Sequence, residues 1–111
     1  RSEDASALAT GFEQSLAVGD PAAACSALAP ETLGELESTA KRRCAAALPA
    51  EQLPVGGPVR EVDVYGRQAR VVLRGDTLFL SQFADGWKVV AAGCLPQRAS
   101  GKPYECAVKG A

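Results

Sequence analysis

Residues 59–92 read VREVDVYGRQARVVLRGDTLFLSQFADGWKVVAA, and three dipeptides in this stretch are typical of tight β-hairpin turns. They are Gly66-Arg67, Gly75-Asp76 and Asp85-Gly86. With a two-residue loop at each turn, the apolar residues of all four segments fall on one side of a sheet. The pairs predicted to lie opposite each other are Val62 with Val71, Val64 with Ala69, Leu73 with Leu78, Val71 with Leu80, Leu80 with Ala91, and Ala84 with Trp87. The stretch therefore predicts a four-stranded antiparallel meander, and residues 104–108 predict a fifth strand.

The first fifty residues have a different composition and periodicity. They carry 14 of the 21 alanines, whereas residues 59–109 carry eight of the ten valines. Apolar residues recur at helical spacing from Ala5 to Leu16, Gly19 ends that helix, and Asp20 caps the next one. A last helix, capped at residue 38 or 39, is predicted before residue 50. The chain is therefore predicted to be one α+β domain, with a helical half (1–50) packed on a twisted antiparallel sheet of four to five strands (59–109).

The charge and the absent residue types exclude several classes of function. The chain has 111 residues, a net charge of −1, and no His, so it lacks the usual general base near neutral pH and the commonest metal ligand. Lys41-Arg42-Arg43 is the only basic run. It fits either a contact with an anionic surface or a solvated helix face on which Glu37 pairs with Lys41. Three charges without interleaved aromatic residues do not predict nucleic-acid binding, and no metal or cofactor is predicted.

The chain has four cysteines, and their number and spacing indicate which chemistry and which cellular compartment suit it. Four cysteines allow three disulfide connectivities, a zinc site or four thiols, but every gap between them is too long for paired zinc ligands. We predict disulfides Cys25–Cys44, between the apolar faces of two helices, and Cys94–Cys106, across the loop that follows the meander. Disulfides indicate an exported protein. The chain opens without an apolar signal segment, so we expect any signal peptide or lipid anchor to have been removed before Arg1.

Several segments resemble a known superfamily. The residues that carry the resemblance are Ala17-Val18-Gly19-Asp20-Pro21 between the first two helices, then residues 85–94 (DGWKVVAAGC) and residues 102–106 (KPYEC). With helices followed by a long meander, the chain resembles the nuclear-transport-factor-2-like (cystatin-like) superfamily, and more closely its small secreted or lipid-anchored actinobacterial domains of unknown function. The resemblance implies a cone-like arrangement of helices on a curved sheet. It does not carry over any of the superfamily's diverse activities.

Enzymes of this superfamily resemble one another in placing an Asp inside the cone. Here the predicted inward face is apolar, with Arg60 and Gln82 as its polar members, and Asp76 is assigned to a turn. No buried carboxylate pair is expected, and the chain is predicted not to be an enzyme. Trp87, Gln82 and Arg60 form a candidate pocket mouth in which Trp87 offers a stacking surface. In the alternative interpretation, Trp87 only closes the end of the core.

The opposite face of the predicted sheet is mixed. Asp63 faces Arg70 as an opposite-charge pair, and Val72, Phe79 and Ala92 form a row. With Phe83 and Val90 beside it, this row is a candidate interface. It predicts either a homodimer or partner contact through Val72, Phe79, Phe83 and Val90, or a face covered by the carboxy-terminal strand and the loop at 96–103.

These observations favour a non-enzymatic, extracytoplasmic domain, secreted or lipid-anchored to the cell envelope, that binds a protein partner or a small apolar ligand. The alternative is a small-molecule isomerase or cyclase that uses the space between helices and sheet. A deep, polar-lined pocket would favour the enzyme, and a filled aliphatic core would favour the binding domain.

Overall fold

A computed structural model describes residues 1–97 and 104–110. Its four helices precede five strands along the chain. The helices are α1 (Ser2–Ala17), α2 (Pro21–Ser26), α3 (Pro30–Ala40) and α4 (Cys44–Ala50). The strands are β1 (Val59–Tyr65), β2 (Gln68–Leu73), β3 (Thr77–Phe83), β4 (Gly86–Pro96) and β5 (Tyr104–Lys109).

The helices begin and end where local chemistry dictates. Gly19 has a φ of +75°, which ends α1, and the Asp20 carboxylate accepts the N–H of Ala23 at 3.2 Å to cap α2. The predicted cap at residue 38 or 39 is wrong, because both residues lie inside α3 and the last helix begins at Cys44. Glu37 caps that helix, since its carboxylate accepts the N–H of Cys44 at 2.8 Å. The predicted pairing of Glu37 with Lys41 is not formed.

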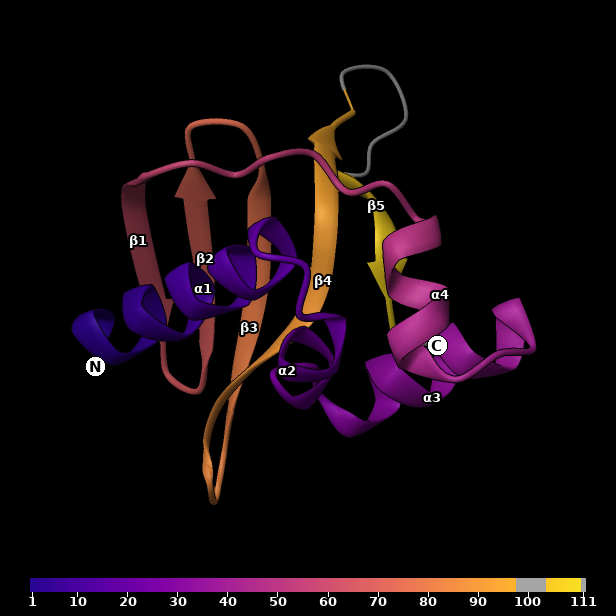
Figure 1. Cartoon of the computed structure of the whole chain (residues 1–111). Helices are drawn as coiled ribbons and strands as arrows, with labels where there is room; N and C mark the ends of the chain where they lie inside the picture. Colours follow the sequence, from indigo (N-terminus) through magenta and orange to yellow (C-terminus); the bar gives the residue numbers. More distant parts are fainter. Residues whose placement is uncertain (98–103, 111) are drawn as a thin grey trace.

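The strands form an open antiparallel sheet in the order β1-β2-β3-β4-β5, and the helices pack on one of its faces (Figure 1). This is the predicted α+β arrangement. The apolar stripe of α1 at residues 5, 9 and 12 is buried against the inward side chains of the sheet. The core between the two layers is filled; its largest fully buried side chains are Phe12, Leu48, Leu78, Leu80, Val71, Val89 and Thr32.

The register confirms part of the predicted meander. Val64 lies opposite Ala69 and Val62 opposite Val71, as predicted. The other two turns are each displaced by one residue. The second turn is Arg74-Gly75, closed by the bond from the Leu73 N–H to the Asp76 carbonyl, and the third is Ala84-Asp85. The observed pairs are therefore Val71 with Leu78, Ala69 with Leu80, Leu80 with Val89, and Gln82 with Trp87. Each displacement moves the opposite residue by two positions, so β2, β3 and β4 keep their predicted inward faces up to Val89. In β1 a bulge at Arg60 pairs Val59 with Leu73, so Val59 packs on the core and the prediction that Arg60 faces inward is wrong.

A β-bulge at Val90 reverses the faces of the rest of β4. Leu80 lies opposite Val89, but the preceding residue, Phe79, lies opposite Ala91. The extra residue turns Ala92 into the core, where it is fully buried, and places Ala91 on the outer face. The prediction of Ala91 inside and Ala92 outside is wrong for this reason.

Both predicted disulfides are present. Cys25–Cys44 joins α2 to α4, and Cys94–Cys106 joins directly opposite residues of β4 and β5. The four cysteines therefore act as covalent links between elements, and no free thiol remains. Two disulfides in so small a chain fit an oxidising environment.

Candidate functional site

Residues 51–58, which we name the strap, cross the ends of the strands between α4 and β1 (Figure 1). The turn between β2 and β3 holds the strap through backbone hydrogen bonds. The Gly75 N–H donates to the Gly56 carbonyl at 2.7 Å, and the Arg74 N–H donates to the Pro58 carbonyl at 3.0 Å. A Cβ on Gly75 would lie only 2.1 Å from the Val55 carbonyl oxygen. Glycine at position 75 is therefore what permits the strap to approach so closely.

Glu13, on α1, lies beneath the strap. Its Oε1 accepts the Gly56 N–H at 3.0 Å, and a Cβ on Gly56 would come within 2.6 Å of that oxygen. Its Oε2 is buried and has no hydrogen-bond partner. Burial raises the pKa of Glu13 to about 7, the Gly56 hydrogen bond opposes this rise, and the negative charge of Asp76 adds to it. Glu13 therefore exchanges a proton near neutral pH.

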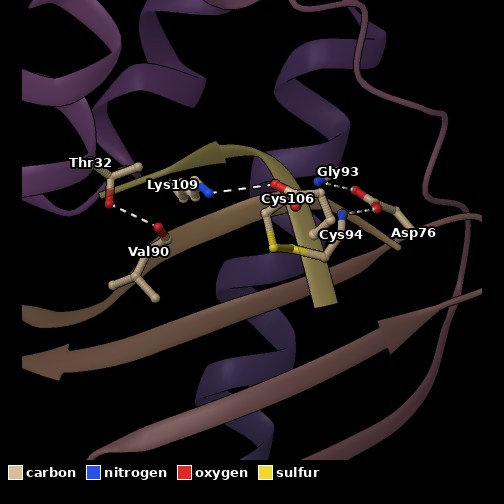
Figure 2. Close-up of a disulfide and its surroundings, with 8 residues drawn as sticks. Thr32, Asp76, Val90, Gly93, Cys94, Cys106 and Lys109 are labelled. Carbon is tan, nitrogen blue, oxygen red and sulfur yellow. Dashed lines mark hydrogen bonds and ion pairs between the residues drawn. A yellow bond between two sulfur atoms is a disulfide. The ribbon is translucent and has the colours of Figure 1, made fainter. Parts of the chain in front are cut away.

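Asp76 occupies a second buried position, on the same turn that holds the strap. It is 7% exposed, and its carboxylate accepts the N–H groups of Gly93 at 3.0 Å and Cys94 at 3.1 Å (Figure 2). Burial raises the pKa of Asp76, and the N–H groups of Thr77, Gly93 and Cys94 oppose the rise. Gly93 has a φ of +66°, so Asp76 secures an irregular point of β4 beside the disulfide. Of these two carboxylates, Asp76 is buried and Glu13 is half-buried.

Two adjoining hollows beside the strap share Leu16 and Leu53 as walls. The wider has a volume of about 240 Å³ and no ionisable residue in its lining. The narrower has a volume of about 110 Å³, and Glu13 is its only ionisable lining residue. Together they form what we name the strap groove, lined by Glu13, Leu16, Ala17, Gly19, Pro21, Leu48, Pro49, Gln52, Leu53, Pro54 and Val55. Val55, also part of this lining, is 85% exposed, so the groove is open to solvent on that side.

The predicted pocket of Trp87, Gln82 and Arg60 is not assembled. Gln82 lies opposite Trp87 near the β3–β4 turn, whereas Arg60 lies near the start of β1, at the other end of the sheet. The error comes from strand direction, because Arg60 and the Gln82–Trp87 pair are all near strand ends but at opposite ends of the sheet's strands. Trp87 is 5% exposed and belongs to the core, and its buried indole N–H has no acceptor. It therefore packs as the residue that closes the end of the core.

The candidate interface lies on the sheet face away from the helices. Val72, Phe79 and Val90 are half-buried, and Phe83 is 37% exposed. The ring of Tyr104, on β5, packs edge to face on Phe79 with centroids 5.0 Å apart, so part of the face is covered by its own chain. Residues 98–103 of the loop predicted to cover it lie outside the described residues.

Charged residues cross the same outer face. The predicted Asp63–Arg70 pair is formed, with the Arg70 Nε 3.1 Å from the Asp63 carboxylate. The guanidinium also bonds Glu61 at 3.1 Å and approaches the Tyr104 hydroxyl at 3.5 Å. This network interrupts the apolar row, so the outer face is a less continuous apolar surface than the strap groove.

Across residues 1–97 and 104–110, no three His, Cys, Asp or Glu side chains lie close enough together to hold a metal ion. None of the helices in the same ranges has the length and apolar character needed to span a membrane. The basic run Lys41-Arg42-Arg43 lies between α3 and α4, and all three residues are at least partly solvent-exposed.

A scan of the chain against protein-family models found no match, and searches of curated proteins and of solved structures found none either. The resemblance to the nuclear-transport-factor-2-like superfamily therefore stays a prediction.

Proposed function

We propose that this chain is a non-enzymatic domain of an extracytoplasmic, oxidising compartment that binds a small, mainly apolar ligand in the strap groove. The observation that carries the proposal is the groove itself, an open apolar hollow whose wider part has no ionisable lining residue. Ligand sites are concave and mainly apolar, with few polar groups. The filled core supports a surface site over an internal one. The two disulfides support the compartment, and secretion or lipid anchoring is part of the proposal.

The test is a titration of ¹⁵N-labelled protein with 1-octanol, followed by amide chemical shifts. We expect saturable shifts at Leu16, Gly19 and Leu53, and none at Phe79 on the outer face. A Val55→Asp variant is expected to weaken binding several-fold, because it places a charge on the groove wall. Val18→Asp is the matched control, since Val18, directly after α1, is 72% exposed but does not line the groove. Shifts confined to the outer face, or no saturable binding, would contradict the proposal.

One observation favours the alternative of a small-molecule isomerase or cyclase. Glu13 is a carboxyl with a pKa of about 7 at the end of an apolar groove, and such a group suits general acid–base chemistry at neutral pH. The test is exchange of α-protons of small ketones in D₂O, with and without the protein. Exchange accelerated by the wild type and abolished in Glu13→Gln would support the enzyme, and equal rates with both proteins would support the binding domain.

A further inference from the structure

The two disulfides differ in their access to solvent. Cys25 and Cys44 are 8% and 4% exposed, and both belong to the hydrophobic core. Neither Cys94 nor Cys106 belongs to that core, and of the four cysteines, all within the described residues, only Cys106 is not buried. Exposed disulfides are the ones that thiols reduce readily, whereas buried cysteines are inert. The disulfide Cys94–Cys106 is therefore the one that a reductant in solution reaches first.

Cys106 lies on β5, and this strand is held differently at its two ends. In the described part of the chain, β5 pairs with β4 alone and is the last strand of the sheet (Figure 1). Near the end of β5, Val108 is 2% exposed and packs in the core. At its start, Tyr104 lies opposite Pro96, which has no N–H to donate to the ladder. The start of β5 is therefore the weaker end, and the disulfide of Cys106 fastens it to β4 (Figure 2).

The start of β5 also covers part of the outer face of the sheet. The ring of Tyr104 packs edge to face on Phe79, with centroids 5.0 Å apart. The Tyr104 hydroxyl is 3.5 Å from the Arg70 guanidinium, which is long for a hydrogen bond. Among the described residues, the ring is therefore kept on Phe79 by weak contacts and by the disulfide two residues away.

We propose that the disulfide Cys94–Cys106 is a redox switch, which a dithiol reductant opens by attack at Cys106. Its opening frees the start of β5 and uncovers Phe79, while the disulfide in the core stays closed. The switch acts on the outer face, so it goes beyond the proposed function and does not depend on ligand binding in the strap groove.

The exchange balances in atoms and electrons. A thiolate of the reductant attacks the Cys106 sulfur, the S–S bond breaks, and Cys94 leaves as a thiolate that takes up a proton. The second thiolate of the reductant then attacks the mixed disulfide and releases Cys106, which is protonated in turn. The reductant is oxidised to a disulfide, and its two electrons and two protons end on the two cysteines.

The contacts of β4 allow the switch to close again. The Asp76 carboxylate accepts the N–H groups of Gly93 at 3.0 Å and Cys94 at 3.1 Å, and these bonds do not involve the sulfur atoms (Figure 2). Val108, packed in the core, keeps the other end of β5 beside β4. Reduction is therefore expected to move the start of β5 alone, and both sulfur atoms stay close enough to re-form the bond on oxidation.

The experiment reduces the folded full chain with increasing dithiothreitol at pH 8, traps the free thiols with N-ethylmaleimide and maps the labelled cysteines by mass spectrometry. We expect Cys94 and Cys106 to be labelled about tenfold faster, or more, than Cys25 and Cys44. The fluorescence of Trp87, which is buried in the core, is expected to stay that of the folded protein while they react.

Proton NMR of the selectively reduced protein then tests the release of β5. The nuclear Overhauser effect between the rings of Tyr104 and Phe79 is expected to disappear, and the amides of Tyr104 and Glu105 are expected to exchange faster, with Val108 unchanged. Cys94→Ala with Cys106→Ala gives the open form without reductant. This double variant is expected to show the same spectrum with and without dithiothreitol, which controls for other effects of the reagent.

Three results would overturn the proposal. The first is reduction of Cys25–Cys44 before Cys94–Cys106 or at the same rate. The second is reduction that occurs only when the fluorescence of Trp87 reports unfolding. The third is a selectively reduced protein that keeps the contact of Tyr104 with Phe79, because the disulfide would then open without any effect on the outer face.

Discussion

Replacing Glu13 with glutamine is expected to change how the free energy of unfolding depends on pH. In the unfolded chain Glu13 titrates near its ordinary pKa of 4.5, whereas burial raises the pKa to about 7 in the folded chain. Below pH 4.5 both states hold the proton, and no penalty arises. Between pH 4.5 and 7 the unfolded state loses its proton first, so the stability of the folded state falls as the pH rises. Above pH 7 the loss is complete.

The structure bounds the size of this effect. A carboxyl whose pKa rises from 4.5 to about 7 on folding destabilises the ionised protein by at most about 3 kcal/mol. The side chain is only partly buried, so solvent screening reduces the expected loss to about 1–2 kcal/mol. Glutamine keeps an oxygen that accepts the Gly56 N–H but carries no charge. The free energy of unfolding of Glu13→Gln minus that of the wild type is therefore expected to be about 1–2 kcal/mol larger at pH 8 than at pH 5.

Urea unfolding at pH 5 and pH 8, followed by the fluorescence of Trp87, measures this difference. Trp87 is the only tryptophan and is buried, so its emission reports loss of the core. Burial also raises the pKa of Asp76, and because this residue is present in both proteins its contribution cancels in the comparison. Glu3→Gln is expected to behave as wild type. If the free energy of unfolding changes by the same amount from pH 5 to pH 8 in wild type and in Glu13→Gln, the strap does not bury this carboxyl.

Three further changes test other parts of the fold. Replacing Cys94 and Cys106 with alanine is expected to cost about 3 kcal/mol on a chain-entropy estimate, measured by urea unfolding, and no loss would show that the link is strained or absent. Gly75→Ala is expected to lower stability by about 1–3 kcal/mol in thermal melts, because its Cβ would lie 2.1 Å from the Val55 carbonyl oxygen of the strap. Gly11→Ala is the control and is expected to raise stability, because a Cβ at this helix position meets no neighbour within 4 Å. A homodimer through the outer face is expected to dissociate in Phe79→Glu, and sedimentation equilibrium that finds the wild type monomeric would rule the dimer out.

Turn dipeptides predicted the meander better than they predicted its register. The alternation of apolar residues predicts which face each strand buries. That prediction stays correct at the two displaced turns, because each turn moves the pairing by an even number of residues. The bulge at Val90 moves the pairing by one residue instead. One extra residue reverses the faces, and Val90, Ala91 and Ala92 are all small enough or apolar enough for either side. The Val89 N–H donates to the Ala27 carbonyl and the Ala29 N–H donates to the Val89 carbonyl, so β4 is held at this point by a segment distant in sequence. Such contacts leave no local pattern.

The candidate site was harder to predict, because the strap creates it. Glu13 sits beside Phe12 at the edge of the apolar stripe of α1, where a charged residue is ordinarily solvated. Its burial comes from residues 51–58, which have no hydrophobic periodicity. The available signal is the Gly56-Gly57-Pro58 run, which is typical of close backbone approach but does not say what is approached. Asp76 was assigned to the turn itself, whereas it closes the turn opposite Leu73, and only the fold brings Gly93 and Cys94 to its carboxylate.

Glu13 and Asp76 both accept hydrogen bonds from irregular parts of the backbone and so hold those parts in place. Irregular backbone leaves N–H groups that no strand or helix can accept, and here Asp76 accepts two of them from β4 while Glu13 accepts one from the strap. Asp76 uses both of its oxygens in this way, so it has little left to offer a ligand. Glu13 uses one, and its second oxygen is held in place by the bond that the first one makes. Accepting these N–H groups places both carboxyls out of solvent, and this burial is what raises the pKa of each one.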